Sequence, residues 1–166
     1  MSYNMSHTVT VTRTTTTSTS AVILNTGYFK TWPGILKFFE LILGIAAVAI
    51  VGYYYNTYYQ LKVPETFFLL IFTTFMIGTF LILFSCLISL STASILSKTV
   101  YESVYHGFAC LLCLIAGLVL LIEVNHYKRS YGNMYESYFA ASVIGLVLAA
   151  LYLISSIFAI RGYRGL

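Results

Sequence analysis

The sequence has very little charge. Only 8% of its 166 residues are Asp, Glu, Lys or Arg, and 59% are apolar. A soluble domain carries roughly 25% charged residues, so this chain lacks the polar residues that would cover a water-soluble globule. The mean hydropathy of +0.86 agrees with this. The composition therefore predicts an integral, multi-pass membrane protein.

Other scarce features each exclude a class of function. The nine basic residues form no run, so we expect no nucleic-acid partner. None of the three cysteines, Cys86, Cys110 and Cys113, lies in a loop, which excludes an extracellular disulfide framework within one chain. The sequence shows no nucleophile–base pair and no phosphate-binding loop. We therefore expect no enzymatic activity, no catalytic residue, no cofactor and no small-molecule substrate.

An apolar signal-peptide core is absent from the first 20 residues. We therefore expect the first hydrophobic helix to act as the membrane-insertion signal. Residues 1–27 are rich in Thr and Ser and cannot bury enough apolar surface to offset the entropy of ordering, which predicts a disordered tail. Its hydroxyls leave two alternatives open, a phosphorylated tail and an unmodified one.

Four long apolar stretches follow the tail. The first, residues 32–52, is 21 residues long, and at about 1.5 Å per residue it spans the roughly 30 Å of a bilayer core. The others cover about 67–90, 100–124 and 138–160. They predict an all-α membrane protein, with a four-helix transmembrane bundle over residues 28–161 and a short tail of residues 162–166.

Basic residues predict the orientation of this bundle. Four spans place both termini on one side of the membrane, and Lys and Arg are enriched on the cytoplasmic side. The side that carries the termini holds six basic residues: Arg13, Lys30, Lys37, Lys98, Arg161 and Arg164. The other side holds three: Lys62, Lys128 and Arg129. We therefore predict that both termini are cytoplasmic.

Four ionisable residues lie inside two of the predicted spans. Lys37 and Glu40 belong to the first span, and Glu102 and His106 belong to the third, all near the predicted cytoplasmic side. Charges in a membrane helix are costly without partners, so we expect a polar cluster that joins the two helices. One interpretation is a structural staple that fixes helix register. The alternative is a proton or ion path.

Small residues in the spans predict close helix packing. Ala141, Gly145 and Ala149 recur every four residues, a pattern that permits close helix contact. We assign Gly44, Gly78 and Gly117 to the same packing role. Packing within the bundle and association with a second copy of the chain both explain this pattern.

Aromatic residues mark the ends of the first span. Aromatic rings are enriched at the headgroup level of membranes, so we predict a set of interfacial aromatics. The set consists of Trp32, Tyr53, Tyr54, Tyr55, Tyr58 and Tyr59.

Two further patterns concern cysteine. His106, Cys110 and Cys113 share one helical face, and imidazole and thiolate groups suit zinc or copper. A tetrahedral site needs a fourth ligand, so we interpret these residues as interface fillers and expect no metal. Cys86 lies near the predicted cytoplasmic end of the second span and is a candidate for S-palmitoylation.

The segment from Gly27 to Gly44 resembles the opening of MARVEL-domain proteins. In that family a basic residue precedes a glycine, and a second basic position and a Glu-Leu pair lead into an apolar run. The matching residues here are Lys30, Gly34, Lys37, Glu40 and Leu41. The resemblance extends to about Arg161, and the size and the tail suggest the chemokine-like-factor or singles bar-like branch.

This resemblance implies four spans, short loops, cytoplasmic termini, and roles in vesicle trafficking, membrane apposition, fusion or cell junctions. We therefore expect a non-enzymatic membrane organiser in the plasma membrane or in vesicle membranes. Its expected partners are the lipid bilayer, other membrane proteins and, as an arrangement left open, a second copy of the chain. The alternative function is a small ion or proton channel, or a transporter, that uses the Lys/Glu/His cluster.

Overall fold

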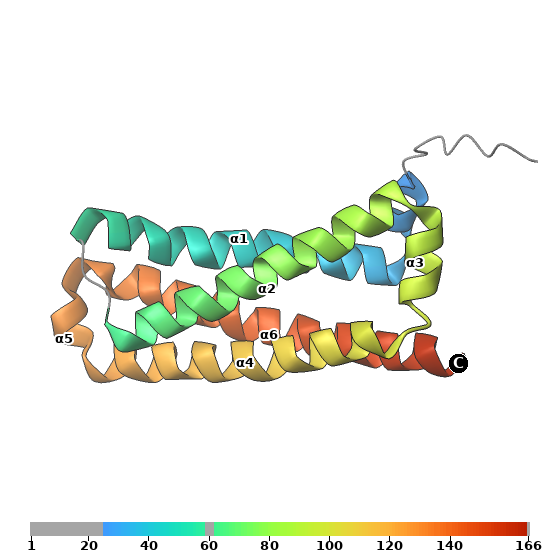
Figure 1. Cartoon of the computed structure of the whole chain (residues 1–166). Helices are drawn as coiled ribbons and strands as arrows, with labels where there is room; N and C mark the ends of the chain where they lie inside the picture. The colour runs from blue at the N-terminus through green and yellow to red at the C-terminus, as the bar shows by residue number, and fades with distance from the viewer. Residues whose placement is uncertain (1–24, 59–61, 166) are drawn as a thin grey trace, which may run out of the picture.

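Four long helices make up most of the chain. A computed structural model describes residues 25–58 and 62–165. The long helices are α1 (Trp32–Tyr58), α2 (Val63–Ile88), α4 (Val100–His126) and α6 (Tyr135–Arg164) (Figure 1). Each contains a stretch that is long and apolar enough to cross a membrane. The predicted all-α, four-span membrane architecture is therefore confirmed.

The long helices extend beyond the predicted apolar spans. α1 continues past Gly52 to Tyr58, and α2 begins at Val63 rather than near residue 67. At that start the Glu65 carboxylate accepts a hydrogen bond from the Lys62 backbone N–H at 3.0 Å, and Pro64 lies in the first turn. Such capping lets a helix continue through polar interfacial residues, which a count of apolar residues does not detect.

Short elements connect the long helices: η1 (Thr26–Lys30), α3 (Leu90–Leu96), α5 (Lys128–Tyr131) and η2 (Gly132–Met134). α3 lies mostly between the second and third predicted spans, where the apolar stretches predict no helix. The Ser89 hydroxyl accepts a hydrogen bond from the Thr92 backbone N–H at 3.2 Å, so a helix begins there.

The last residues of the predicted tail, 25–27, belong to the described structure. The Asn25 backbone N–H donates to the Leu87 carbonyl at 2.7 Å, and its side-chain amide donates to the Cys86 carbonyl at 3.4 Å. These bonds attach the start of η1 to the end of α2. Residues 1–24 of the predicted tail lie outside the described residues.

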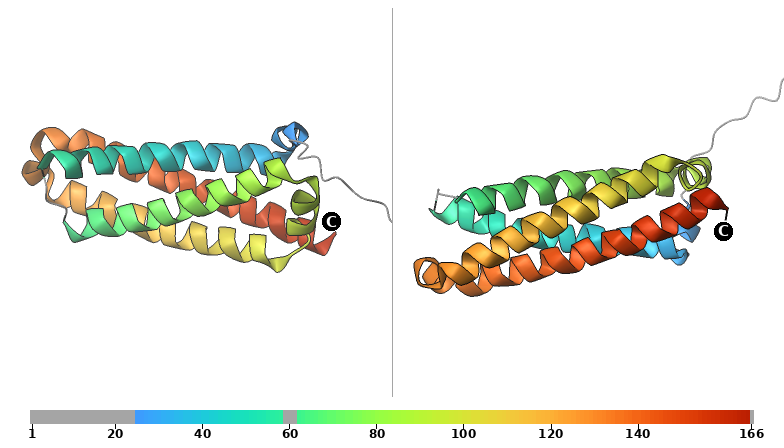
Figure 2. Two further views of the ribbon diagram at one scale, coloured as in Figure 1. Left: turned by 45° about the horizontal axis from the view of Figure 1, so that its top comes forward. Right: turned by 90° about the horizontal axis from the view of Figure 1, so that it is seen from below.

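The long helices form a four-membered ring. α1 packs against α2 and α6, and α4 also packs against α2 and α6. Consequently α1 faces α4 across the bundle centre, and α2 faces α6. The start of α1, α3 and the end of α6 lie at one end, which we call the termini end, and α5 lies at the opposite α5 end (Figures 1 and 2).

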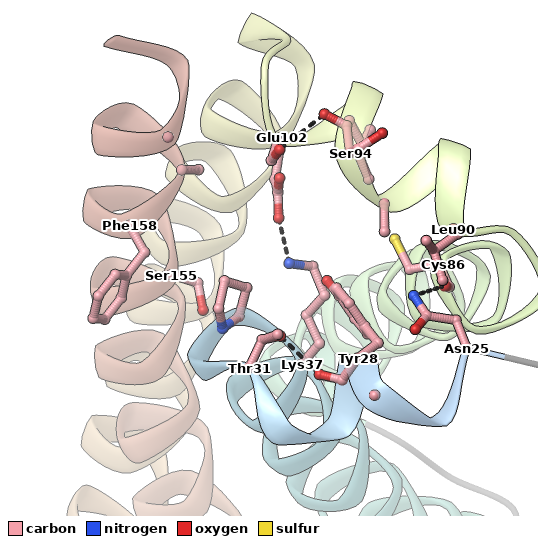
Figure 3. Close-up of a pocket in the computed structure, with 17 residues that line it drawn as sticks. Asn25, Tyr28, Thr31, Lys37, Cys86, Leu90, Ser94, Glu102, Ser155 and Phe158 are labelled. Atoms are coloured by element: carbon pink, nitrogen blue, oxygen red, sulfur yellow. Dashed lines mark hydrogen bonds and ion pairs between the residues drawn. The ribbon is translucent and has the colours of Figure 1, made fainter. Parts of the chain in front are cut away.

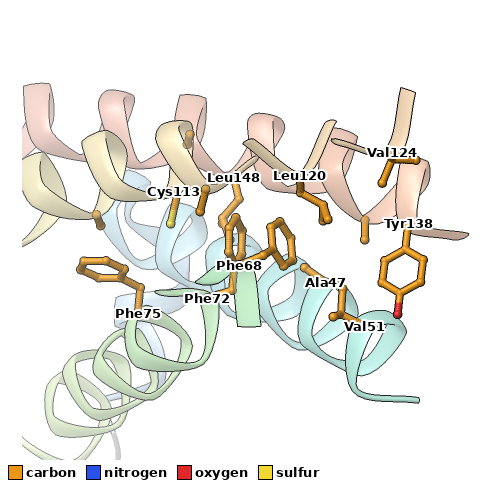
Figure 4. Close-up of a cluster of buried hydrophobic side chains, with 14 of the residues drawn as sticks. Ala47, Val51, Phe68, Phe72, Phe75, Cys113, Leu120, Val124, Tyr138 and Leu148 are labelled. Carbon is orange, nitrogen blue, oxygen red and sulfur yellow. The ribbon is translucent and has the colours of Figure 1, made fainter. Parts of the chain in front are cut away.

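Towards the α5 end, aromatic rings fill the bundle centre. Phe68 and Phe72 of α2 stack with ring centroids 4.0 Å apart and an interplanar angle of 16° (Figure 4). Gly145 of α6 lies against them, and a Cβ at that position would be 2.8 Å from Phe72 Cζ and 2.9 Å from Phe68 Cε2. The missing side chain of Gly145 therefore makes room for the stacked pair.

The predicted small-residue stripe lies inside the bundle. Ala141, Gly145 and Ala149 are all buried. Of the assigned glycines, Gly44 packs on Met76, Gly78 on Tyr105 and Gly117 on Leu146. These contacts support packing within the bundle, the first of the two explanations for the pattern.

Candidate functional site

The four ionisable residues predicted inside the spans all lie in the bundle interior, in the half nearer the termini end. The exposed fraction is 1% for Lys37, 0% for Glu40, 6% for Glu102 and 0% for His106. Lys37 Nζ forms an ion pair with Glu102 Oε1. Since α1 and α4 lie on opposite sides of the ring, this pair crosses the bundle centre.

Glu40 has a partner that the sequence reasoning did not identify. Its Oε1 accepts a hydrogen bond from the Ser155 hydroxyl of α6 at 2.5 Å. A helical signal could have found Ser155, because Gly145, Leu148, Tyr152 and Ser155 recur at spacings of three and four and are all buried. The cluster therefore joins three helices, α1, α4 and α6, and not only two.

His106 lies between the two carboxylates. Its Nδ1 is 3.9 Å from Glu40 Oε2, and its Nε2 is 3.9 Å from Glu102 Oε1. Neither nitrogen has a hydrogen-bond partner within the described chain, and the same holds for Glu40 Oε2. With one lysine, two glutamates and one histidine, a single proton decides whether the cluster is neutral or carries a net charge.

A network of hydroxyl groups extends the polar region toward the middle of the bundle. Thr79 Oγ1 lies 2.8 Å from the Tyr152 hydroxyl and 3.0 Å from the Tyr105 hydroxyl. The Tyr105 hydroxyl donates to the Phe75 carbonyl at 2.8 Å. The network connects α2, α4 and α6.

Apolar side chains fill the core beyond this network. Phe68, Phe72, Leu120 and Leu148 are all almost completely buried in the half of the bundle nearer the α5 end (Figure 4). The cluster and the hydroxyl network are therefore separated from the α5 end by a packed apolar layer.

A pocket of about 490 Å³ lies above the cluster at the termini end (Figure 3). Lys37, Glu102 and Ser155 form its floor. Its walls come from η1, the first turn of α1, the end of α2, α3 and the end of α6, and they are mainly apolar. Ligand pockets commonly have volumes of about 300–1,000 Å³, so this pocket is large enough for part of a small molecule.

Tyr28 of η1 covers one side of the pocket. Its hydroxyl lies close to the Cys86 thiol, and burial raises the pKa of Tyr28 above its ordinary value. Cys86 is only 1% exposed, so its thiol is not accessible for S-palmitoylation in this conformation.

The predicted interfacial aromatics lie at the two ends of α1. The Trp32 and Tyr53 side chains are exposed, and the Tyr54 hydroxyl lies 2.8 Å from Ser137 Oγ. The backbones of Tyr55 and Tyr58 belong to α1. The side chains of these two tyrosines, and all of Tyr59, lie outside the described residues.

The three residues of the considered metal pattern have different surroundings. His106 belongs to the ionic cluster, Cys113 is buried in the apolar core, and Cys110 is half-buried. Among residues 25–58 and 62–165, no group of three or more His, Cys, Asp or Glu side chains is arranged to hold a metal ion.

Comparison with known proteins gives one match. A family model described as MARVEL, membrane-associating domain, matches residues 28–158. This range includes the whole ionic cluster and most of the four long helices. No curated protein and no solved structure matches the chain.

Proposed function

Since this chain belongs to the MARVEL family of membrane-associating domains, we propose that it is a non-enzymatic membrane organiser. It acts in vesicle trafficking, in membrane apposition or fusion, or at cell–cell junctions. Its location is the plasma membrane or the membrane of vesicles.

The distribution of apolar side chains carries this proposal. In the most apolar stretch of each membrane-spanning segment, only 33% to 39% is buried inside the bundle. The larger part of each stretch is therefore partly or fully exposed on the outer surface. Such an apolar outer surface matches lipid rather than water. Outward-facing examples come from all four long helices: Ile42, Ile45, Leu70, Ile77, Leu111, Ile122, Val147 and Leu153.

Short elements alone make up the remainder of the described chain. Outside the long helices, residues 25–58 and 62–165 form only η1, α3, α5, η2 and brief connections. The described residues can therefore contact mainly the lipids of the bilayer, their headgroups and other proteins embedded in the membrane. Small connections at the α5 end favour close approach of a second membrane.

Any lateral association uses the outward apolar faces. Ala141, Gly145 and Ala149 are occupied by packing inside the bundle, so they do not offer a surface to a second copy. Lipid-facing side chains such as Val104 and Phe108 of α4 remain available to other membrane proteins.

Conduction is the less well supported alternative. An ion or proton path needs polar groups from one side of the membrane to the other. The ionic cluster and the hydroxyl network reach the middle of the bundle, but Phe68 and Phe72 pack tightly beyond them. The cluster therefore fits a structural staple better than a path.

Reconstitution separates the two functions. We expect liposomes that contain the purified chain to cluster or mix lipids more than protein-free liposomes do, with no added proton flux. Tyr53→Ser, at the α5 end, should reduce clustering, whereas the matched Trp32→Ser at the termini end should not. Proton flux without clustering, from correctly folded protein, would overturn the organiser proposal.

A further inference from the structure

Exposed basic residues lie near the pocket at the termini end, which we call the end pocket. Three exposed basic residues directly adjoin lining residues in the sequence: Lys30 precedes Thr31, Lys98 follows Ser97, and Arg161 precedes Gly162. None of these three cations forms an ion pair with a carboxylate in the described part of the chain. This end therefore carries positive charge that no carboxylate of residues 25–58 and 62–165 neutralises.

Packing brings the backbone segments that carry two of these cations close together. A Cβ at Gly162 would lie 3.1 Å from the Ser97 carbonyl oxygen, so the end of α6 packs tightly on the turn between α3 and α4. Arg161 and Lys98 flank this contact. The only carboxylate that lines the pocket is Glu102, and it is already paired with Lys37.

The pocket interior has a different character from its rim. Leu90, Leu96, Phe158 and Ala159 supply apolar walls. The floor residues Lys37 and Glu102 satisfy each other and are almost completely buried, so they require no charged group from a ligand. An apolar cavity near exposed cations that have no carboxylate partner among the described residues suits a molecule with an apolar chain and an anionic head.

We propose that this pocket binds one anionic phospholipid from the adjacent leaflet. One acyl chain occupies the cavity between η1, α3 and the end of α6, and the phosphate-bearing headgroup contacts Lys98, Arg161 and Lys30. The cavity volume of about 490 Å³ accommodates a chain and not a whole lipid. The cytoplasmic leaflet, to which we assign the termini end, is the leaflet that is rich in anionic lipids.

Native mass spectrometry of the full chain tests this proposal. The protein is released from detergent micelles that contain phosphatidylserine and phosphatidylcholine with identical acyl chains. We expect one phosphatidylserine to be retained per chain in preference to phosphatidylcholine. Lys98→Gln and Arg161→Gln should each lower this preference about five-fold, since a basic residue near a membrane surface contributes about that factor.

Pocket-filling variants separate cavity binding from general attraction to a cationic surface. Ser94→Leu and Ala93→Leu add volume to the α3 wall without changing charge, so both should abolish retention of the lipid. Ser94 is exposed, so its variant should keep the fold, and an unchanged melting temperature would verify this even if Ala93→Leu unfolds. Lys128→Gln, at the α5 end, is the matched charge control and should retain phosphatidylserine.

Two results would overturn the proposal. Retention of phosphatidylserine by a folded Ser94→Leu variant at the level of the original chain would show that lipid binds only the cationic surface. Equal retention of phosphatidylcholine would show that the rim cations do not select the headgroup. Neither result depends on the vesicle-clustering assay, so the organiser proposal is tested separately.

Discussion

Lys37 and Glu102 extend long side chains into the bundle centre from helices on opposite sides of the ring. Their ion pair, with Glu40 and Ser155 beside it, fills the centre near the termini end. Towards the α5 end, the rings of α2 fill the same central space by reaching across to Gly145 on α6. We call the two pairs of opposite helices the diagonals of the bundle. An ion pair bridges the diagonal of α1 and α4, and aromatic packing bridges the diagonal of α2 and α6 at a different depth.

The ionic diagonal gives the first prediction. Lys37→Met leaves the Glu102 carboxylate buried without its cation, so the free energy of unfolding should fall by about 3–5 kcal/mol. Removing both charges in Lys37→Met/Glu102→Leu should recover most of this loss, because no unpaired charge remains. Unfolding of the purified variants in detergent micelles measures both effects. An unchanged stability of Lys37→Met would mean that the pair does not hold α1 and α4 together.

The aromatic diagonal gives the second prediction. Gly145→Leu places a side chain where the rings of Phe68 and Phe72 lie, so the free energy of unfolding should fall by about 1–3 kcal/mol through overpacking. Val147→Leu is the matched control, because Val147 is 49% exposed on the outer face of the same helix. Equal melting temperatures of the two variants would contradict the inward orientation of the stripe.

Sequence alone was sufficient for the charged members of the candidate site but not for their partners. Lys37, Glu40, Glu102 and His106 stand out because an ionisable group is rare in an apolar run. Ser155 and Thr79 do not stand out, since a serine or threonine occurs in membrane helices without a comparable cost. The pairing of Lys37 with Glu102 rather than with Glu40 depends on helix rotation, which hydropathy does not specify.

At the scale of elements, η1 can pack closely on the start of α1 because Gly34 has no side chain. A Cβ at Gly34 would collide with the Tyr28 carbonyl oxygen. The Thr31 hydroxyl donates to that same carbonyl at 2.7 Å and accepts the Gly34 backbone N–H at 3.2 Å, which starts α1. The small helix can therefore cover the end pocket only when residue 34 is glycine.

Displacing η1 should expose the thiol beneath it. In Gly34→Ala, Tyr28 can no longer lie on Cys86, so a membrane-permeant maleimide should label Cys86 faster than in the original chain. Mass spectrometry of the labelled peptides distinguishes Cys86 from Cys110 and Cys113 without replacing either. Gly52→Ala, whose added Cβ would meet nothing within 4 Å, is the matched control and should leave labelling unchanged. Slow labelling in both variants would show that η1 tolerates the extra methyl group.

The elements that the sequence predicted well are those with a strong hydropathy signal. Four apolar runs gave the four long helices, whereas η1 and α3 escaped detection because they are short and depend on single capping contacts. Asn25 bonds to Leu87 and Cys86, residues about sixty positions away, and no local pattern in the tail signals such contacts. The start of α2 was missed for a related reason. Glu65 caps this helix by accepting a hydrogen bond from the Lys62 backbone N–H, but a search for apolar residues stops at such a polar side chain.

For the whole molecule, the charge distribution differs between the two ends. Exposed Lys30, Lys98, Arg161 and Arg164 lie at the termini end, where the two carboxylates, Glu40 and Glu102, are both buried in the ionic cluster. The α5 end has as many carboxylates as cations: the cations are Lys62, Lys128 and Arg129, and the carboxylates are Glu65, Glu123 and Glu136. Lys and Arg are enriched on the cytoplasmic side of membranes, so this difference supports the prediction that the termini end is cytoplasmic.

Labelling in sealed microsomes tests this orientation independently of the final location of the protein. We expect a membrane-impermeant maleimide to label Ser94→Cys on α3, because the cytoplasmic face of a microsome is outermost. Ser130→Cys on α5 should react only after the membrane is permeabilised, and both introduced thiols lie at exposed positions. Removing the charge excess with Lys98→Gln, Arg161→Gln and Arg164→Gln should give a mixed population, in which each site is partly labelled. If Ser130→Cys were labelled in intact microsomes and Ser94→Cys were not, both termini would lie on the opposite side of the membrane. The end pocket would then lie in the leaflet that is poor in anionic lipids, which would also contradict the proposed lipid site.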